Sequence, residues 1–453
     1  MFFVSFVIFV AAAVGRFASA RDTVRILYLA DIRFPLERAN GIQSMETCHA
    51  LAARGHEVTL VVRPDTHTPP RDPFAFYGLP RIGAADHADQ SRAAEYADHA
   101  DLGTLTIEGA PITGPAASRR VGYLTFAIGR AMGRTRQDLI FTRDLGLASL
   151  LLRIPASLRA PVVYEAHGIA ADVAAALPGL LTGAPEASPA KLRRLARREA
   201  HVWKGAEGYV TITTGLKREL ERRFTSRTRI AVVPDGTRVT NDPDARSPTP
   251  DPRSPMFTIG YAGHLYPWKG VDLIIEAVAA LPDTRGLIVG GHEKEPDLAR
   301  VKAFAAELNC ASRVTFTGLI PPAEVGARLR QADVLALPNP RSVISSEFTS
   351  PLKLFEYMAS GRPIVASDLP SLREILRHEE NALLVEPGNP QALVAGIQRI
   401  KDEPELGRRL AAQARVDVAQ FTWARRAERL EALFSDVGGR SAFAATPLRR
   451  DKP

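Results

Sequence analysis

The sequence predicts two doubly wound α/β domains that face each other across a cleft. Its 453 residues are too many for one compact core and suit two domains of ordinary size. Short apolar runs alternate with stretches of helical periodicity on both sides of a proline-rich segment at 239–256. Buried apolar strands of this kind are typical of parallel sheets that helices cover on both faces.

The first predicted domain spans residues 21–238. A strand at Val24–Ala30, a helix at Ser44–Arg54 that stops at Gly55, and a strand at Glu57–Val62 form one βαβ unit. The further predicted strands of this domain are 104–107, 138–142, 161–165, 208–213 and 230–233. Open sheets of this Rossmann-like type bind ligands beyond the carboxyl ends of their strands, so the loops there are the candidate site.

Residues 239–256 are predicted to be a linker, because Thr240–Pro255 contains five prolines and no apolar side chain larger than alanine. The second predicted domain covers residues 257–420. Its predicted strands are 257–262, 286–290, 314–317, 333–337, 363–367 and 382–385, with helices at 271–281 and 297–308. A last helix within 421–436 is expected to pack back on the first domain, and 437–453 form a tail.

The first twenty residues are excluded from the fold. Met1–Val14 is almost wholly apolar, and Ala18-Ser19-Ala20 resembles a signal-peptide cleavage site, but no Lys or Arg precedes the apolar run. The apolar run is also shorter than the roughly 20 residues that a membrane-spanning helix needs. A signal peptide, a weak membrane anchor and a mis-assigned start all remain open for residues 1–20.

Charge and cysteine content narrow the classes of function. The 58 basic and 50 acidic residues leave a net charge of +8, which favours anionic partners. Cys48 and Cys310 are too few for a disulfide framework or a thiolate zinc site.

Two stretches of the first domain are rich in basic residues. They contain Lys191, Arg193, Arg194, Arg197, Arg198 and Lys204, then Lys217, Arg218, Arg222, Arg223, Arg227 and Arg229. These stretches form either a solvated face or a surface for an anionic membrane, and no nucleic-acid-binding motif accompanies them.

A glycine-rich turn near the start of the second domain carries the first candidate chemistry. Gly263 permits a tight turn, Lys269 offers a cation, and Gly270 opens a helix whose amino end favours anions. These residues predict a phosphate-binding turn. An ordinary turn with a surface lysine is the alternative interpretation.

The segment 349–368 carries the second candidate chemistry. A polar loop enters a helix at a proline, which suits a first helical position, and the amide groups of that first turn can hold phosphate oxygens. Glu356 follows one turn later and can accept hydrogen bonds from ribose or sugar hydroxyls, since a carboxylate would be repelled by the phosphate itself. The candidate donor-binding residues here are Ser350, Pro351, Leu352, Lys353 and Glu356.

These two segments resemble the donor-binding half of family 4 glycosyltransferases, which have the two-domain GT-B fold and use nucleotide sugars. The family pattern G-R-L-x-x-x-K-G is matched by Gly263, Leu265, Lys269 and Gly270. The later pattern, which ends in A-x-G-x-P-V-V-A after a glutamate, is matched by Glu356, Ala359, Gly361, Pro363, Val365 and Ala366. The ordered similarity extends over most of the chain from Val24 to about Leu433.

Two positions depart from the family pattern. His264 stands where the family has an arginine, which removes or weakens a second cationic contact to the donor phosphates near neutral pH. Phe348 stands where the family has the first of two glutamates, and Glu347 lies one residue away. Glu347 therefore either takes over the role of that glutamate or is a solvated loop carboxylate.

The resemblance also implies site residues in the first domain. Ala39–Gln43 is placed in the loop after the first strand, and its Gly41 corresponds to glycines that approach the donor phosphate. His167 follows a strand at its carboxyl end, where the family has a histidine beside the transferred sugar. Val233–Gly236 is expected to line the cleft.

The function implied is transfer of a sugar from a nucleotide diphosphate sugar to a glycan or lipid-linked acceptor, with retention of configuration. The resemblance implies catalytic roles for His167, Lys269 and Glu356, with no metal and no cofactor beyond the donor substrate. Because nucleotide sugars are held in the cytosol, the protein is expected in the cytoplasm, peripherally bound to the inner face of the membrane. A nucleotide-sugar-binding protein without turnover and a non-hydrolysing nucleotide-sugar epimerase remain alternatives.

Two other enzyme classes fit the sequence poorly. Asp31–Gly41 contains a single glycine where a nicotinamide-binding fingerprint needs three. Asp242-Pro243-Asp244 has the letters of an Asp-x-Asp metal site, but it lies in the predicted linker with no strand to deliver it. No metal site is therefore predicted.

Overall fold

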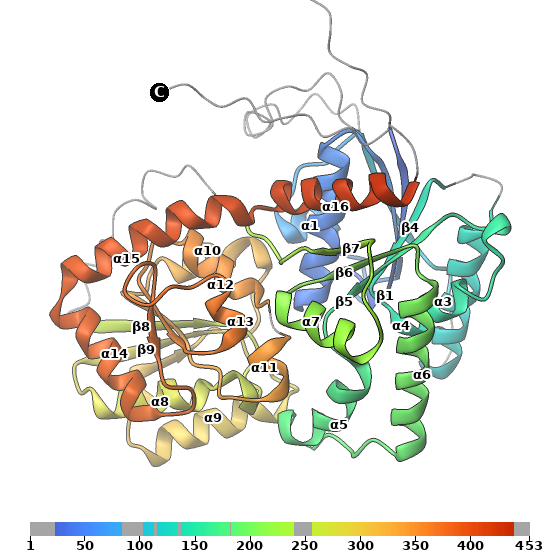
Figure 1. Ribbon diagram of the computed structural model, residues 1–453. Helices are drawn as coiled ribbons and strands as arrows, with labels where there is room; N and C mark the ends of the chain where they lie inside the picture. Colours follow the sequence, from blue (N-terminus) through green and yellow to red (C-terminus); the bar gives the residue numbers. More distant parts are fainter. Residues whose placement is uncertain are drawn as a thin grey trace, which may run out of the picture.

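The computed structural model describes residues 23–83, 103–112, 116–133, 137–181, 183–239, 256–348 and 350–438. The predicted segment 1–20, nearly all of the linker 239–256 and residues 439–453 of the tail lie outside these residues. The described chain forms two parallel sheets, each covered by helices, that lie side by side (Figure 1). None of the described helices combines the length and the apolar character that crossing a bilayer requires.

Seven parallel strands form the first sheet, in the order β3-β2-β1-β4-β5-β6-β7. The strands are β1 (Arg25–Arg33), β2 (Glu57–Arg63), β3 (Thr104–Gly109), β4 (Leu139–Thr142), β5 (Val162–Ala166), β6 (Gly208–Thr211) and β7 (Ile230–Val232). Tyr28 of the central strand β1 pairs with Leu60 of β2 on one side and with Phe141 of β4 on the other. The strand order reverses at this point, and ligands bind beyond the carboxyl edge at such a reversal.

Helices cover both faces of the first sheet. They are α1 (Ala39–Ala53), α2 (Pro73–Tyr77), α3 (Ala116–Ala131), α4 (Leu145–Leu151), α5 (Ala170–Leu180), α6 (Pro189–Gly205) and α7 (Thr214–Arg223). The side chains of Asp144, Ser188 and Thr213 accept hydrogen bonds from the backbone amides at the starts of α4, α6 and α7. Each of these helices therefore begins where the sequence supplies a capping side chain.

Helix α1 begins earlier than the sequence predicts. The predicted helix started at Ser44, with Ala39–Gln43 in a loop, whereas the structure places Gly41 inside the first turn of α1. A Cβ atom on residue 41 would lie 2.6 Å from the backbone oxygen of Leu36 and 2.7 Å from the hydroxyl of Tyr77. Glycine is required because the preceding chain folds closely over the start of the helix. The glycine signals this close approach and not a loop.

Six parallel strands form the second sheet, in the order β10-β9-β8-β11-β12-β13. These strands are β8 (Phe257–Ala262), β9 (Thr284–Val289), β10 (Val314–Phe316), β11 (Val334–Leu337), β12 (Ile364–Ser367) and β13 (Leu383–Val385). The helices are α8 (Val271–Ala280), α9 (Pro296–Glu307), α10 (Pro322–Leu329), α11 (Val343–Glu347), α12 (Leu352–Ala359), α13 (Pro370–Arg373), α14 (Pro390–Asp402), α15 (Pro404–Asp417) and α16 (Trp423–Gly438). Both sheets are therefore doubly wound α/β units.

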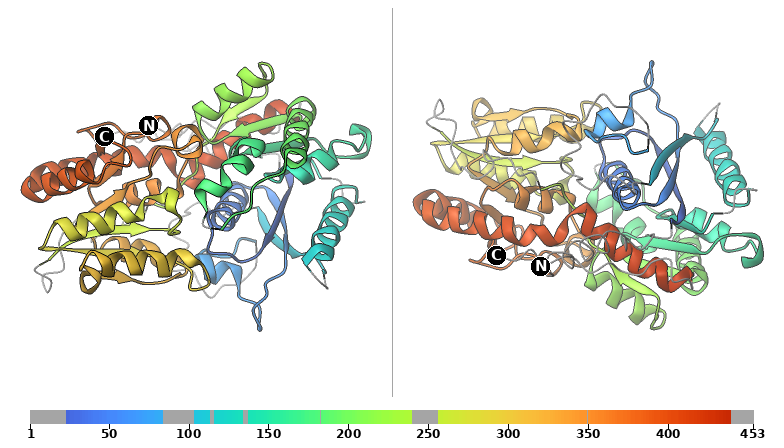
Figure 2. Two further views of the ribbon diagram at one scale, coloured as in Figure 1. Left: turned by 90° about the horizontal axis from the view of Figure 1, so that it is seen from below. Right: turned by 90° about the horizontal axis from the view of Figure 1, so that it is seen from above.

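The last helix, α16, leaves the second domain and packs on the first. Figure 2 shows α15 and α16 crossing both domains in succession. Leu430 and Phe434 of α16 are fully buried in the same apolar core as Leu51 of α1. The ring of Phe434 meets that of Phe141 in β4 edge-on, with centroids 5.5 Å apart. The end of the chain thus contributes to the core that its beginning forms.

Replacing Leu430 by alanine should lower the free energy of unfolding by about 2–5 kcal/mol, as expected for truncation of a fully buried leucine. Val416 on α15, which is 67% exposed, provides the control, and Val416→Ala should change it by less than about 0.5 kcal/mol. Denaturant unfolding followed by circular dichroism measures both variants. Equal effects would contradict the packing of α16 into the first core.

Candidate active site

A cleft of about 320 Å³ lies between the two domains. From the first domain it is lined by Glu37, Ala39, Ile42, His167, Ile212 and Asp235, and from the second chiefly by Gly263, His264, Lys269, Phe348, Ser350, Pro351, Leu352, Lys353 and Glu356. Two predicted site residues are not placed in it. Gly41 lies within α1, where its neighbours Ala39 and Ile42 reach the cleft instead, and the side chain of Glu347 lies outside the described residues.

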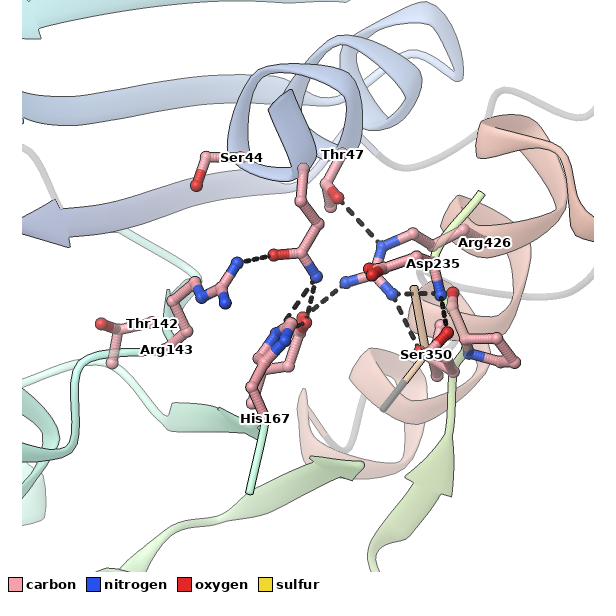
Figure 3. A network of polar contacts seen from close by, with 12 residues as sticks. Ser44, Thr47, Thr142, Arg143, His167, Asp235, Ser350 and Arg426 are labelled. Carbon is pink, nitrogen blue, oxygen red and sulfur yellow. Dashed lines mark hydrogen bonds and ion pairs between the residues drawn. The ribbon is translucent and has the colours of Figure 1, made fainter. Parts of the chain in front are cut away.

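A buried carboxylate, Glu165, bonds to both His167 and Arg426 in the polar network on the first-domain side of the cleft. Figure 3 shows His167 and Arg426 in this network. Oε1 of Glu165 lies 2.5 Å from Nε2 of His167 and also accepts a hydrogen bond from the side-chain amide of Gln43. Its Oε2 accepts a hydrogen bond of 2.6 Å from Nη2 of Arg426. Burial opposes ionisation of Glu165, but the charge of Arg426, the hydrogen bond with His167 and the charge of Arg143 hold its pKa well below its usual range. Glu165 is therefore a buried anion.

Arg426 provides the cation that balances Glu165. Its side chain is 1% exposed, and all of its remaining bonds go to first-domain groups. Nε donates to the hydroxyl of Thr47 in α1 at 3.0 Å, and Nη1 donates to the backbone oxygens of Val233 and Pro234 at 2.9 and 3.0 Å. Arg426 thereby joins α16, α1 and the residues that lead out of the first sheet.

His167 reaches the cleft from the carboxyl end of β5, as the sequence predicts. Burial and the nearby charge of Arg143 lower the pKa of His167 to about 4, and Glu165 opposes this shift. The ring is therefore neutral at neutral pH. Because an ionised carboxylate can only accept, the short contact with Glu165 assigns the proton to Nε2, which leaves Nδ1 as an acceptor.

Gln43 and Arg143 complete this network, and the sequence analysis did not identify either residue. The guanidinium of Arg143 donates to the side-chain oxygen of Gln43, whose amide nitrogen donates to Glu165. Figure 3 shows Arg143 and Arg426 approaching this centre from opposite sides. These two hydrogen bonds fix the orientation of the Gln43 amide between Arg143, which follows β4, and Glu165 of β5.

Asp235 adds a second buried carboxylate to the cleft. Its side chain is buried, and Oδ1 has no hydrogen-bond partner among the described residues. The backbone amide of Asp235 donates to the hydroxyl of Ser350 at 3.2 Å, which is a contact between the two domains. Burial raises the pKa of Asp235 to about 6, and the charge of Arg426 opposes the rise. This oxygen can accept a hydrogen bond from a ligand hydroxyl.

Two lysines from the second domain face the cleft without carboxylate partners among the described residues. Nζ of Lys353 lies 4.0 Å from the ring centre of Tyr261 and has no hydrogen-bond partner there. Nζ of Lys269 lies 3.6 Å from the ring centre of Trp268. Burial lowers the pKa of Lys269 to about 7, and burial together with Lys269 lowers that of Lys353 well below its usual range. An anion between the two amines would reverse both shifts.

Helix α12 presents its amino end to the same space. Pro351 is the extended N-cap residue and not the first helical residue that the sequence predicts, because the helical conformation begins only at Leu352. No side chain caps this end, and the amide of Leu354 donates to the backbone oxygen of Pro351 at 2.8 Å. Among the described residues, the amides of Leu352 and Lys353 have no such partner and can hold an anion. Glu356 lies one turn further along and lines the cleft. Burial and the negative charge of Glu46 raise its pKa to about 7, against the charge of Lys353.

His264 is held by a carboxylate that reaches both domains. Nδ1 of His264 lies 3.3 Å from Oε2 of Glu295, and the hydroxyl of Tyr266 donates to Oε1 at 3.0 Å. Arg38, at the start of α1, forms an ion pair of 3.1 Å with the same Oε1. Burial lowers the pKa of His264, so near neutral pH this position does not supply the full charge of an arginine.

Phe348 occupies the position of the family's first glutamate as an apolar residue. It is 4% exposed and packs in a cluster with Ile169 and Ile212 of the first domain. The backbone of Glu347 ends α11.

Among the described residues, no group of three His, Cys, Asp or Glu side chains is arranged to hold a metal ion. The Asp242–Asp244 segment lies outside the described residues.

The fold and the cleft define a class of protein in which two Rossmann-like domains enclose a cleft, lined here by His167 from the first domain and by Lys269 and Lys353 from the second. The first domain matches the family model "Glycosyltransferase Family 4" over residues 42–240. The second domain matches the model "Glycosyl transferases group 1" over residues 249–417. The chain therefore belongs to the family 4 glycosyltransferases and has the GT-B fold.

Individual relatives agree with this family. The D-inositol 3-phosphate glycosyltransferase of Corynebacterium glutamicum is 32% identical over 194 residues, which are 40% of this chain and 44% of the relative. The enzyme of the same name from Nocardia farcinica is 30% identical over 60% of each chain. The matches thus span about half the length of these curated relatives.

Solved structures share the fold at low sequence identity. The sucrose-phosphate synthase of Thermosynechococcus elongatus superimposes with a TM-score of 0.68 at 21% identity, over 92% of this chain and 99% of that one. The Anabaena protein HepE, in complex with UDP and glucose, gives a TM-score of 0.64 at 15% identity, over 91% of this chain and 99% of that one. These similarities support the GT-B architecture.

Arg426→Met should lower the free energy of unfolding at pH 7 by about 3–5 kcal/mol, because it leaves the Glu165 carboxylate buried without its main counter-charge. In the unfolded chain the pKa of a glutamate is about 4.3, and in the folded wild-type protein the pKa of Glu165 is lower. Ionised Glu165 therefore stabilises the wild-type protein above about pH 4.3, and this contribution declines as the pH falls below that value. In the variant, protonation relieves the buried charge, so the difference between the two proteins should shrink as the pH falls.

Denaturant unfolding at pH 7 and at pH 5 measures this difference. Adding Glu165→Gln to Arg426→Met should recover part of the loss at pH 7, because the carboxylate is removed. A loss that is independent of pH and of Glu165 would show that the ion pair does not contribute.

Proposed function

We propose that the protein transfers a sugar from a nucleotide diphosphate sugar to a hydroxyl group of a glycan or lipid-linked acceptor. The observation that carries this proposal is the pair of amines beside the uncapped amino end of α12, of which Lys353 is buried and Lys269 is partly buried. Two amines that an anion would protonate, together with free amides, are suited to a diphosphate. Family membership supports the same substrate class.

The leaving diphosphate would lie between Lys269 and the first turn of α12. Its negative charge increases as the bond to the sugar breaks, and pre-oriented cations and amides stabilise that charge most in the transition state. Burial lowers the pKa of Lys269 to about 7, so protonation of Lys269 would accompany donor binding. We propose that these groups supply the positive charge of the site, so that transfer needs no divalent metal and no further cofactor.

The nucleoside would extend past α12, where Glu356 accepts hydrogen bonds from ribose hydroxyls. Glu356 has no protein partner among the described residues, and it lines the cleft beyond Lys353. A hydroxyl pair can satisfy its oxygens in the ionised form. This assignment separates the carboxylate from the diphosphate by about one helical turn, which limits repulsion between them.

The transferred sugar would occupy the space between the diphosphate and the first domain. There the acceptor nitrogen of His167 and the unpartnered oxygen of Asp235 can receive hydrogen bonds from sugar hydroxyls. Glu165 and Gln43 hold His167 in place during closure of the cleft. We infer retention of the anomeric configuration from the family resemblance alone.

The acceptor and the location follow from the supply of the donor and from the surface charge. Nucleotide sugars are held in the cytosol, so we propose that the reaction takes place there. The first domain is basic, which favours binding to an anionic membrane surface. An enzyme on that surface would use a lipid-linked or polysaccharide acceptor. Relatives named D-inositol 3-phosphate glycosyltransferase suggest phosphorylated acceptors as a second panel to test. Transfer in an assay with nucleotide sugars and acceptors separates this function from binding alone. Epimerisation of the donor without an acceptor would indicate the epimerase alternative.

Lys269→Ala should reduce kcat/KM by the equivalent of about 2–4 kcal/mol, because it removes one stabilising contact to the leaving diphosphate. The control is Lys294→Ala, since Lys294 is exposed and does not line the cleft. Initial rates and calorimetric titration with the nucleoside diphosphate measure the effect. Wild-type affinity and turnover in folded Lys269→Ala protein would contradict the phosphate assignment.

Glu356→Gln should leave folding intact but weaken donor binding, because the amide keeps the shape of the side chain and loses the charged acceptor. Affinity for a donor with a 2′-deoxyribose should change much less than affinity for the ribose donor. Glu307→Gln on the exposed side of α9 is the matched control. If Glu356→Gln binds both donors as the wild type does, the ribose role is wrong.

A further inference from the structure

A strongly basic surface lies on the first domain, remote from the cleft. Figure 1 shows α3, α4 and α6 on the side of the first domain that faces away from the second. Two adjoining hollows of about 560 and 310 Å³ are present there, and they share Arg194 and Arg198. The cations that line them, here called the arginine cluster, are Arg120, Arg153, Arg193, Arg194, Arg197 and Arg198.

The arginine cluster is only partly neutralised by the protein, because Arg120 is its one member that pairs with carboxylates among the described residues. Its four members on α6 form no ion pair with any carboxylate among the described residues. Arg153 donates to the backbone oxygen and the hydroxyl of Ser149. Arg120 is 58% exposed, and its closest carboxylate oxygens, of Asp31 and Asp144, lie 3.5 and 3.9 Å away. The cluster therefore presents an excess of positive charge.

Like charges lie close together on α6, and their mutual repulsion destabilises the protein when no anion is bound. Arg193 and Arg197 are four residues apart, as are Arg194 and Arg198, and like charges at this spacing repel each other on a helix. The opposite side of α6 is anchored, since Val202 and Trp203 are buried and Glu199 accepts from the amide of Ala170. The arginines are thus held on a fixed helix face and cannot easily disperse.

The second basic stretch, on α7, is different. Arg222 and Arg223 both donate to Glu219, and Arg223 also pairs with Asp172. Arg227 is partly buried and donates to the backbone oxygen of Ala206 at 2.6 Å. The sequence analysis places both stretches on one basic surface. In the structure, Arg222 and Arg223 of α7 and Arg227 beyond its end already have partners. The unneutralised charge is concentrated on α6 and its neighbours.

We propose that the arginine cluster binds the phosphate groups of an anionic lipid bilayer and holds the first domain on the membrane surface. Guanidinium groups suit this role because their planar fork can donate two hydrogen bonds to one phosphate. Cations from α3, from α6 and from the turn after α4, spread over two hollows, match an array of phosphates better than a single small anion. Val121, beside Arg120 on α3, leaves 65% of its apolar surface exposed and can contact the bilayer interface.

The arginine cluster is the specific surface for the membrane association that the proposed function includes. Donor binding and sugar transfer do not require this surface. The cluster is distant from the cleft, so a bilayer there leaves the cleft accessible. Binding to vesicles and transfer to a soluble acceptor are separate measurements. Loss of one without the other therefore shows which proposal has failed.

The test is co-sedimentation of the full chain with vesicles of phosphatidylglycerol and phosphatidylcholine, compared with vesicles of phosphatidylcholine alone. The difference between the two measures charge-dependent binding. The double variant Arg194→Gln and Arg198→Gln should lower it about 25-fold, since each cation at an anionic surface contributes about fivefold. The matched control is Arg218→Gln with Arg222→Gln, two arginines at the same spacing on α7, and it should change binding by less than about threefold. Soluble-acceptor transfer should be unchanged in both.

Two results would overturn the proposal. Equal loss of vesicle binding in the two double variants would show that net charge, and not the arginine cluster, is responsible. In a competition experiment, a short DNA duplex and an excess of phosphatidylglycerol vesicles are each added to the vesicle-bound protein. If the duplex displaces the protein at a lower phosphate concentration than the added vesicles do, the arginine cluster is a nucleic-acid surface instead.

Discussion

The buried ion pair between Arg426 and Glu165 connects the end of the chain to the floor of the cleft. Both side chains are at most 1% exposed, and Nη2 of Arg426 lies 2.6 Å from Oε2 of Glu165. Removing two charges from water is costly, and the cost is offset only when their other hydrogen-bonding groups are also satisfied. Here Thr47 and the backbone oxygens before the linker accept the remaining bonds of Arg426. The pair therefore holds α16 against the first domain in one register.

The same pair determines how His167 is presented. Glu165 precedes His167 by two residues and holds its ring at a distance of 2.5 Å from the carboxylate. Because Arg426 keeps Glu165 ionised, the proton of the neutral imidazole stays on Nε2 and the other ring nitrogen remains an acceptor. A helix that leaves the second domain thus fixes the tautomer of a first-domain residue. This linkage makes the position of α16 part of the site.

The two walls of the cleft carry opposite chemistry. The second domain presents Lys269 and Lys353 with no carboxylate partner in the described chain, whereas the first presents Asp235 with an unsatisfied oxygen. A ligand with a diphosphate at one end and hydroxyl groups at the other satisfies both walls together. Each wall alone would bind only part of such a ligand, so its binding favours closure of the two domains.

The sequence predicts the parts of this arrangement that depend on local patterns. Apolar runs locate the strands of both sheets. The turn at Gly263 and the helix after Pro351 are recognisable because residues that are neighbours in the sequence form each candidate anion site. The partners Gln43, Arg143 and Arg426 could not be found in this way, since they come from segments brought together only by the fold. One signal was present for Arg426. It interrupts the apolar stripe of Trp423, Ala427, Leu430 and Phe434, and a charged residue on such a face requires a buried partner.

The most direct test of the account is calorimetric titration of the full chain with nucleoside diphosphates of each common base and with the matching monophosphates, in the presence of a chelator. The account predicts that at least one diphosphate binds, that its monophosphate binds at least tenfold more weakly, and that chelation leaves both affinities unchanged. A protein that binds no nucleoside diphosphate, or binds one only when a divalent metal is supplied, would contradict the assignment of Lys269 and α12 to the donor diphosphate.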